Sequence, residues 1–124
     1  MLKLSVSSHF DSAHYLRGYE GPCANLHGHT WKYTVVIEGE KSDDLGMLID
    51  FKYLKKMMSD MEKMFDHKCI NEVSPFTSTN PTAENLATYM YFYFRPHLPT
   101  FINIVSVTVN ESDDCSATYF EEDK

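Results

Sequence analysis

Alternation of apolar and polar residues marks two segments in the first third of the chain. Segments 2–7 and 31–37 each place apolar side chains at every second position. Side chains on a β-strand point to opposite faces in turn, so both segments are predicted to be strands with one buried face. Glycines and charged residues over 39–46 predict a loop before the next element.

The hydrophobic period then changes to that of an α-helix. Over 51–65 the apolar residues, several of them core-filling methionines, recur every three or four positions, and Asp50 is placed to cap the first turn. A second helix is predicted to begin near 80–82, where proline suits the first turn, and to end at Pro96. Its aromatic run over 89–94 is too broad for one buried stripe, so we expect part of it to face another subunit.

Two more alternating segments end the chain. Apolar residues alternate over 105–109, and a turn at 112–114 leads into a final strand over 117–120. The order ββααββ predicts an α+β fold: a four-stranded antiparallel sheet with two helices on one face. A chain of 124 residues has room for one core, so we expect 1–124 to form a single domain.

The composition excludes several classes of protein. A formal net charge of −7 disfavours a nucleic-acid partner, because phosphate backbones are held by clustered Lys and Arg. The chain has neither a long apolar run nor a signal-peptide pattern, so no membrane association is expected. Three cysteines without CxxC spacing predict reduced thiols in a cytoplasmic protein. We expect Cys69 and Cys115 to be small buried hydrophobic residues, and the partner to be a small molecule.

The candidate chemistry centres on His27-Gly28-His29, with Cys23 and His14 shortly before it. Two histidines one residue apart in an extended segment point to the same side, so both rings can reach one metal ion. Three histidines leave a fourth position open, as in catalytic zinc sites. An isolated His-Gly-His is more often a pair of ordinary strand histidines, but His14 and Cys23 nearby favour Zn²⁺.

Two further groups of titratable residues are candidates. Asp66 and His67 follow the first predicted helix, and a carboxylate beside an imidazole can fix its tautomer for proton transfer. Glu111 continues the parity of the preceding strand, which places its carboxylate on the apolar side, where the ring edge of a pterin or guanine could hydrogen-bond to it. A plain helix end and a solvent-exposed strand end are the alternative interpretations.

Six motifs in the same order resemble those of one family. Over nearly its whole length the chain is similar to the 6-pyruvoyl-tetrahydropterin synthase family, which includes the 6-carboxytetrahydropterin synthases. Three residues between Cys23 and His27 are typical of the carboxy branch; animal-type pyruvoyl synthases usually have five, and a third branch replaces the cysteine with glutamate. The motifs are Phe10-Asp11-Ser12-Ala13-His14, Cys23-Ala24-Asn25-Leu26-His27-Gly28-His29, Leu48-Ile49-Asp50-Phe51, Asp66-His67, Asn80-Pro81-Thr82-Ala83-Glu84 and Asn110-Glu111.

The resemblance implies a tunnelling fold (T-fold), in which trimers close a barrel, two trimers commonly pair, and the site lies where subunits meet. It also implies conversion of 7,8-dihydroneopterin triphosphate to 6-carboxy-5,6,7,8-tetrahydropterin, acetaldehyde and triphosphate, on the pathway to queuosine and other 7-deazapurines. The implied zinc ligands are His14, His27 and His29. The implied catalytic groups are the thiol base Cys23 and the carboxylate–imidazole pair Asp66 and His67. The implied pterin-binding residues are Glu111, Thr82 and Glu84.

Alternative functions stay open at this point. The pyruvoyl synthase reaction uses the same substrate and the same site residues. A zinc hydrolase would need a general base but not the thiol. A non-catalytic zinc-stabilised module would collapse on chelation and bind no pterin. Spacing does not show which basic residue meets the triphosphate, the candidates being Arg17, Lys32, Lys52 and Lys68.

Overall fold

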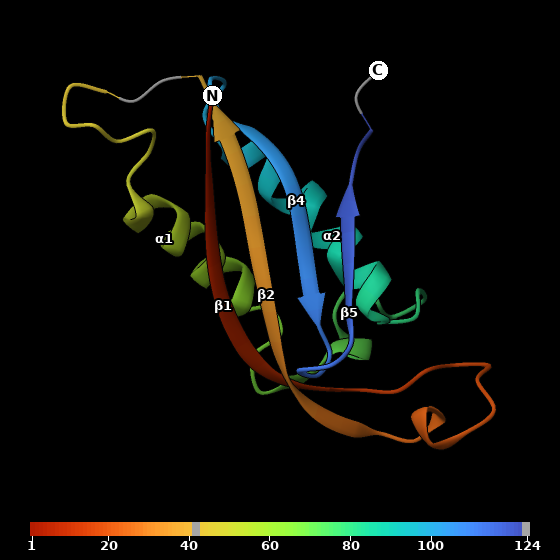
Figure 1. Ribbon diagram of the computed structural model, residues 1–124. Coiled ribbons are helices and arrows are strands. Elements are labelled where there is room, and N and C mark those ends of the chain that lie inside the picture. The colour runs from red at the N-terminus through yellow and green to blue at the C-terminus, as the bar shows by residue number, and fades with distance from the viewer. Residues whose placement is uncertain (41–42, 123–124) are drawn as a thin grey trace.

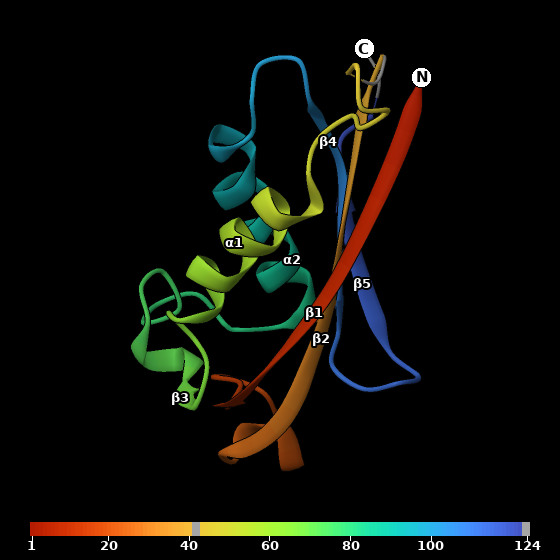
Figure 2. The same ribbon diagram turned by 90° about the vertical axis from the view of Figure 1, so that its left-hand side faces the viewer.

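The computed structural model describes residues 1–40 and 43–122, so residues 41–42 of the predicted loop and the end of the predicted domain lie outside the described residues. One mixed sheet has the strand order β3-β1-β2-β4-β5, and both α-helices cover the same face of it (Figures 1 and 2). The elements are β1 (Leu2–His14), β2 (His27–Gly39), α1 (Phe51–Glu62), β3 (Lys68–Cys69), α2 (Ala83–Phe94), β4 (Asn103–Asn110) and β5 (Ser116–Phe120).

The predicted four-stranded antiparallel sheet was wrong in one respect. A fifth strand, β3, lies between the helices in sequence and pairs with β1 in parallel, Ser12 opposite Lys68 and Ala13 opposite Cys69. The other strands pair antiparallel as predicted. A two-residue strand is too short to produce a hydrophobic period, and it exists only because the edge of β1 offers free backbone groups.

Both helices were predicted, with small errors at their ends. Asp50 caps α1 as expected, its carboxylate accepting a hydrogen bond from the Lys52 N–H at 2.8 Å. α1 ends before Phe65 because its last turn tightens to a three-residue hydrogen-bond pattern. α2 begins at Ala83 with Thr82 as its cap, and a short 3₁₀ turn contains Pro96. Within the described ranges, neither helix is long and apolar enough to cross a membrane.

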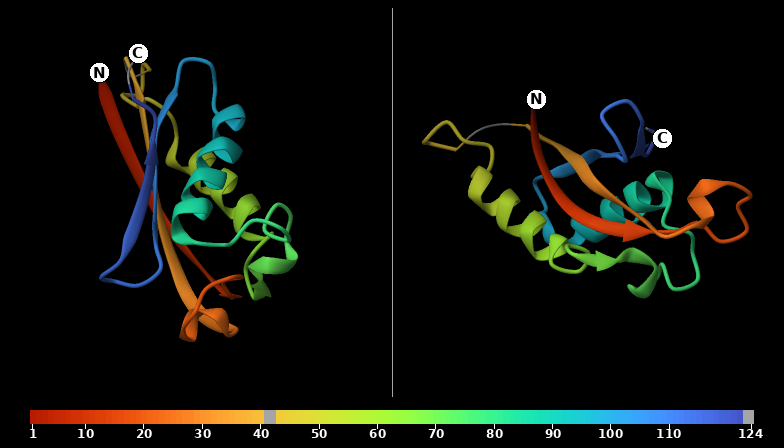
Figure 3. Two further views of the ribbon diagram at one scale, coloured as in Figure 1. Left: turned by 90° about the vertical axis from the view of Figure 1, so that its right-hand side faces the viewer. Right: turned by 90° about the horizontal axis from the view of Figure 1, so that it is seen from below.

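The β1–β2 hairpin extends beyond the rest of the sheet. Each strand has 13 residues, and they pair along their whole length from Leu2 opposite Gly39 to His14 opposite His27. β4 joins β2 only from Lys32 onward. Among the described strands, the segment 27–31 therefore has β1 as its only neighbour, and the hairpin end with its loop projects past β4 and β5 (Figures 1 and 3).

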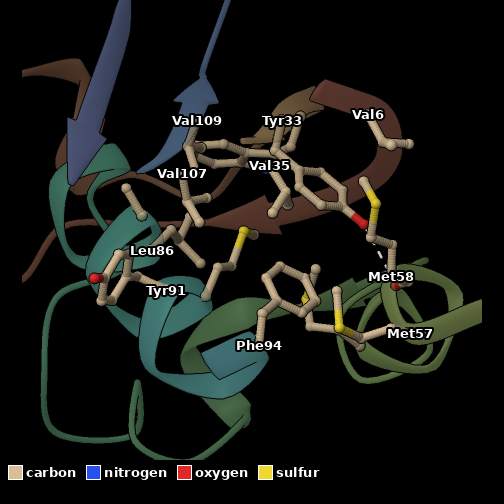
Figure 4. Close-up of a cluster of buried hydrophobic side chains, with 14 of the residues drawn as sticks. Val6, Tyr33, Val35, Met57, Met58, Leu86, Tyr91, Phe94, Val107 and Val109 are labelled. Carbon is tan, nitrogen blue, oxygen red and sulfur yellow. Dashed lines mark hydrogen bonds between the residues drawn. The ribbon is translucent and has the colours of Figure 1, made fainter. Parts of the chain in front are cut away.

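The core lies between the sheet and the two helices (Figure 4). From the aromatic run on α2, Tyr91 and Phe94 point into this core, whereas Phe92 is 46% exposed. Tyr33 crosses the core, and its hydroxyl donates to the Glu62 carboxylate at 2.6 Å, with the Met58 carbonyl oxygen at 3.3 Å. This hydroxyl attaches α1 to the middle of β2. Burial, with Glu62 as a hydrogen-bonded neighbour, raises the pKa of Tyr33 well above its usual value.

We expect Tyr33→Phe to lower the free energy of unfolding by about 1.5–3 kcal/mol, because the half-buried Glu62 carboxylate loses a charge-assisted hydrogen bond. Urea denaturation followed by circular dichroism measures the change. Tyr53→Phe is the matched control, since the exposed Tyr53 hydroxyl bonds only to the His97 carbonyl oxygen among the described groups, and its loss should cost under about 0.5 kcal/mol. Equal losses in the two variants would contradict this role for Tyr33.

Candidate active site

Three imidazoles meet at the projecting end of the hairpin. His14 ends β1, while His27 and His29 begin β2; His14 lies directly opposite His27, and His29 is two residues further along the same face. The ring centroids are 4.5 Å apart for His14 and His27, 4.8 Å for His27 and His29, and 5.2 Å for His14 and His29. Trp31 packs edge-on against His14 and His29 on the core side. The spacing that suggested a shared site therefore brings these rings together.

Hydrogen bonds fix two of these rings from outside. His14 Nδ1 lies 2.8 Å from the Pro81 carbonyl oxygen, and His27 Nδ1 lies 2.7 Å from that of Asn25. Such a bond holds the proton on Nδ1 and leaves the Nε2 lone pair for a metal. His14 Nε2 and His29 Nε2 are buried without a hydrogen-bond partner. Burial lowers the pKa of His14, against the opposing effect of the Pro81 carbonyl, so its ring is neutral at neutral pH, as a metal ligand must be.

Glu111 adds a carboxylate to the histidines. It follows β4 on the side of Val107 and Val109, and its Oε1 lies 3.0 Å from His29 Nε2 and 3.6 Å from His14 Nε2. The donor atoms of the three histidines and Glu111 all lie within 4.8 Å of one another. Three imidazoles, two of them with a buried Nε2 that lacks a hydrogen bond, beside a carboxylate are a donor set that zinc prefers. The residues present therefore fit the metal that the sequence predicted.

A second glutamate stands close to this cluster. Glu84, in the first turn of α2, lines a pocket of about 250 Å³ together with Glu111 and with Cys115 from the β4–β5 turn. Thr82, which precedes this turn, uses its hydroxyl oxygen to accept the Asn85 N–H at 3.1 Å and so caps the helix.

Cys115 is exposed, and Cys69 is only partly buried, so the prediction that both are buried hydrophobic residues was wrong. A turn residue has no strand neighbours to cover it.

Asp66 and His67 form a pair at the edge of β1. The Asp66 carboxylate contacts His67 Nδ1 at 3.0 Å and accepts the Asp11 N–H at 3.0 Å. These two hydrogen bonds hold the pKa of the Asp66 carboxyl below its usual value. Asp11 also brings its own carboxylate within 4.8 Å of the pair, where the Thr30 hydroxyl donates to it at 2.6 Å. Sequence reasoning missed Asp11, although its parity opposite to His14 signals a carboxylate on the outer face of β1.

Of the basic residues considered for the triphosphate, Arg17 is turned inward. Its guanidinium donates to the Phe76 carbonyl oxygen at 3.0 Å and lies 3.5 Å from that of Asn71. Lys68, next to His67, donates to the Lys63 carbonyl oxygen at 3.1 Å and remains exposed. Lys68 therefore remains a candidate phosphate ligand, whereas Arg17 has a structural role.

Residues 3–122 match the family described as 6-pyruvoyl tetrahydropterin synthase. The chain belongs to this family. Among the relatives, a 6-carboxy-5,6,7,8-tetrahydropterin synthase of Bacillus subtilis is 30% identical over 125 residues, which cover 94% of this chain and 84% of the relative. A dihydroneopterin monophosphate aldolase of Pyrococcus furiosus is 33% identical over 105 residues, with 85% of each chain covered.

The fold predicted from the family resemblance is confirmed at the level of the whole chain. The structure of Caenorhabditis elegans 6-pyruvoyl tetrahydropterin synthase superposes with a TM-score of 0.87 at 28% identity, covering 98% of this chain and 96% of that chain. The family match thus extends over both helices, the sheet and the hairpin end that carries the histidines.

The motif residues of this family do not all meet within one chain. Side chains alternate along β1, so His14 and the exposed Asp11 point to opposite faces of the sheet. Asp66 and His67 gather with Asp11 on the outer face, while the histidines face the helices. Cys23 is half-buried in the loop between β1 and β2 and is not among the four clustered donors. In the described part of a single chain, the acid/base pair and the metal cluster are thus two distinct groups of donor atoms, although His29 and His67 line one pocket beside β1.

Proposed function

We propose that the protein is a zinc-dependent 6-carboxytetrahydropterin synthase of the pathway to queuosine and other 7-deazapurines. It would convert 7,8-dihydroneopterin triphosphate to 6-carboxy-5,6,7,8-tetrahydropterin, acetaldehyde and triphosphate. The observation that carries the proposal is the histidine cluster, with buried unpartnered Nε2 atoms, beside a pocket lined by two glutamates. The curated relatives of the carboxy branch and the three-residue spacing after Cys23 favour this reaction over its neighbours.

The pocket divides the binding roles of the two glutamates. Glu111 already faces His14 and His29, so its carboxylate is placed beside the reacting side chain of a pterin. Glu84 projects from the first turn of α2 into the same pocket, where it can accept two N–H donors from a pterin ring edge. Thr82 would contribute through the helix turn that it caps. Glu111 would anchor the ring as the sequence-based prediction has it, and Glu84 would complete the pocket.

The chemistry requires proton transfer at the side-chain carbons. Zinc held by His14, His27 and His29 would act as a Lewis acid toward the substrate's hydroxyl groups. Cys23 would remove a proton from carbon, and His67 would exchange protons through the ring nitrogen that Asp66 does not contact. Asp66 would fix the orientation of the imidazole, which is the usual task of such a carboxylate.

A complete site would then need more than one chain. His67 opens to the outer face of the sheet, so a neighbouring subunit would bring it to the metal cluster of the next chain. A head-to-tail contact of this kind closes into a ring, consistent with the trimer or dimer of trimers expected from the family resemblance. The single domain over 1–124 and the cytoplasmic location stay predictions.

Product analysis tests the proposal. Incubation of zinc-loaded protein with 7,8-dihydroneopterin triphosphate should yield a carboxy-pterin and acetaldehyde, identified by mass spectrometry. A pyruvoyl-pterin product would instead indicate the pyruvoyl synthase reaction. A parallel assay uses dihydroneopterin monophosphate, and turnover of this substrate alone would indicate the reaction named for the archaeal aldolase. Unchanged substrate in both assays would contradict the assignment to a pterin reaction.

We expect Cys23→Ala to lower kcat by about 10²–10⁴-fold while zinc stays bound, because the thiol lies outside the four clustered donors. Turnover and zinc content by inductively coupled plasma mass spectrometry are measured on the same preparation. Cys69→Ala is the matched control, because Cys69 on β3 lies outside both the donor cluster and the pocket of Glu84 and Glu111, and it should keep most of the activity. Full activity of the Cys23 variant would favour a zinc hydrolase, which needs no thiol.

A further inference from the structure

Two asparagine side chains act as partners for the backbone just after β1. Asn71 accepts the Tyr15 N–H and donates to the Tyr15 carbonyl oxygen, both at 3.0 Å. Asn80 does the same for Arg17, with both hydrogen bonds at 2.9 Å. Tyr15 and Arg17 are alternate residues, so the two amides replace the ladder that a neighbouring strand would form at this edge. We call Asn71 and Asn80 the asparagine pair.

The loop held in this way carries the thiol. Between Tyr15 and Arg17, the Leu16 N–H donates to the Cys23 carbonyl oxygen at 2.9 Å. This hydrogen bond closes the loop between β1 and β2 and positions Cys23 relative to the backbone that the asparagine pair holds. The Arg17 guanidinium reaches the segment between the two asparagines, where it donates to the Phe76 carbonyl oxygen at 3.0 Å.

The asparagine pair also belongs to the segment that supports the other site residues. Asn80 precedes Pro81, and the Pro81 carbonyl oxygen contacts His14 Nδ1. The carbonyl oxygen of Asn80 accepts a hydrogen bond from the Asn85 side-chain amide at 2.8 Å. Asn71 is only 4% exposed. A buried amide that satisfies one N–H and one carbonyl of the same residue cannot be replaced by an aliphatic or carboxylate side chain without leaving a polar group unpaired.

We propose that Asn71 and Asn80 are positioning residues for the Cys23 loop, holding the segment that carries the thiol through the backbone of residues 15–17. The inference rests on the proposed role of Cys23 as the base. Neither asparagine touches the substrate in this proposal. Their loss should therefore lower kcat with little change in KM, because Glu84 and Glu111 would still bind the pterin.

Asn80 is the residue to change, since it is only partly buried. Asn80→Asp keeps the shape and the acceptor for the Arg17 N–H but loses the donor to the Arg17 carbonyl oxygen, and Asn80→Ala loses both. We expect hydrogen–deuterium exchange at residues 15–17 to rise about tenfold in both variants. Iodoacetamide labelling of Cys23, followed peptide by peptide, should accelerate severalfold relative to Cys115, with zinc content unchanged. Asn103→Ala, at an exposed position at the start of β4, is the matched control.

The readouts separate the two proposals. Unchanged exchange and Cys23 labelling in both Asn80 variants would overturn the positioning role, whatever the wild-type protein catalyses. A wild-type protein that forms no pterin product overturns the proposed function, whereas faster labelling in the Asn80 variants still supports the hold on the loop. A rise in KM without loss of kcat would overturn the positioning role too, because it would place Asn80 in substrate binding.

Discussion

Co-expression of Cys23→Ala and His67→Ala chains is expected to restore turnover that neither variant shows alone. The metal cluster and the Asp66–His67 pair lie on opposite faces of one sheet, so a site that uses both draws them from two subunits. In a mixed oligomer, sites that combine an intact Cys23 with an intact His67 form at random. Equal mixing should therefore recover about a quarter of the wild-type rate over all oligomers, and about a third in trimers that contain both chains.

The measurement uses differently tagged chains, so that only mixed oligomers are purified and assayed. Cys23→Ala combined with His27→Ala is the matched control: we place these two residues in one site of the same chain, and mixing should restore nothing. If the mixture of the Cys23 and His67 variants shows no turnover, one chain supplies both groups. If turnover recovers in both mixtures, the thiol and the histidine ligands of one site come from different subunits, contrary to our assignment.

Removal of the metal is expected to abolish turnover and to loosen only the end of the hairpin. Residues 27–31 pair with β1 alone among the described strands, so the histidine cross-link contributes much of what holds this end. Chelation, or His29→Ala, should raise hydrogen–deuterium exchange at residues 12–15 and 27–31. The core around Tyr33 and the helices should keep its cooperative unfolding transition.

Exchange mass spectrometry with thermal unfolding on the same samples measures this difference. Reloading with zinc should restore both the protection and the turnover of the wild-type protein, but not of His29→Ala. Loss of the whole unfolding transition on chelation would favour the non-catalytic zinc-stabilised module. Unchanged protection at the hairpin end would contradict metal binding by these histidines.

Most of the fold could be predicted from the sequence, because strands and helices that bury one face have a regular period of hydrophobic residues. Segment 31–37 lies on β2 and residues 51–62 form α1, and most of their apolar positions face the common core. β3 leaves no such trace, since two residues paired to the free edge of β1 depend on tertiary contact alone. The C-terminal end of α1 also escaped prediction because its tightened last turn keeps Phe65 in the core after the helix has ended.

The candidate site was predictable where its residues share one pair of neighbouring strands. His14, His27 and His29 meet because strand parity and the β1–β2 register act over short distances. Glu84 is different, because only the docking of α2 against the β4–β5 turn places it in the pocket of Glu111. The face to which His67 opens depends on the path of the chain around the edge of β1, which no local pattern encodes.

The projecting hairpin end has a consequence for how this chain can change over evolutionary time. The thiol and the connecting loop lie beyond the part of β2 that pairs with β4. Insertions or substitutions over 18–26 can therefore alter the reacting loop without repacking Tyr33, Phe94 or their neighbours. Because the packed core and the reactive loop are separate parts of the fold, a few mutations in the loop can change the product of the reaction without destabilising the core.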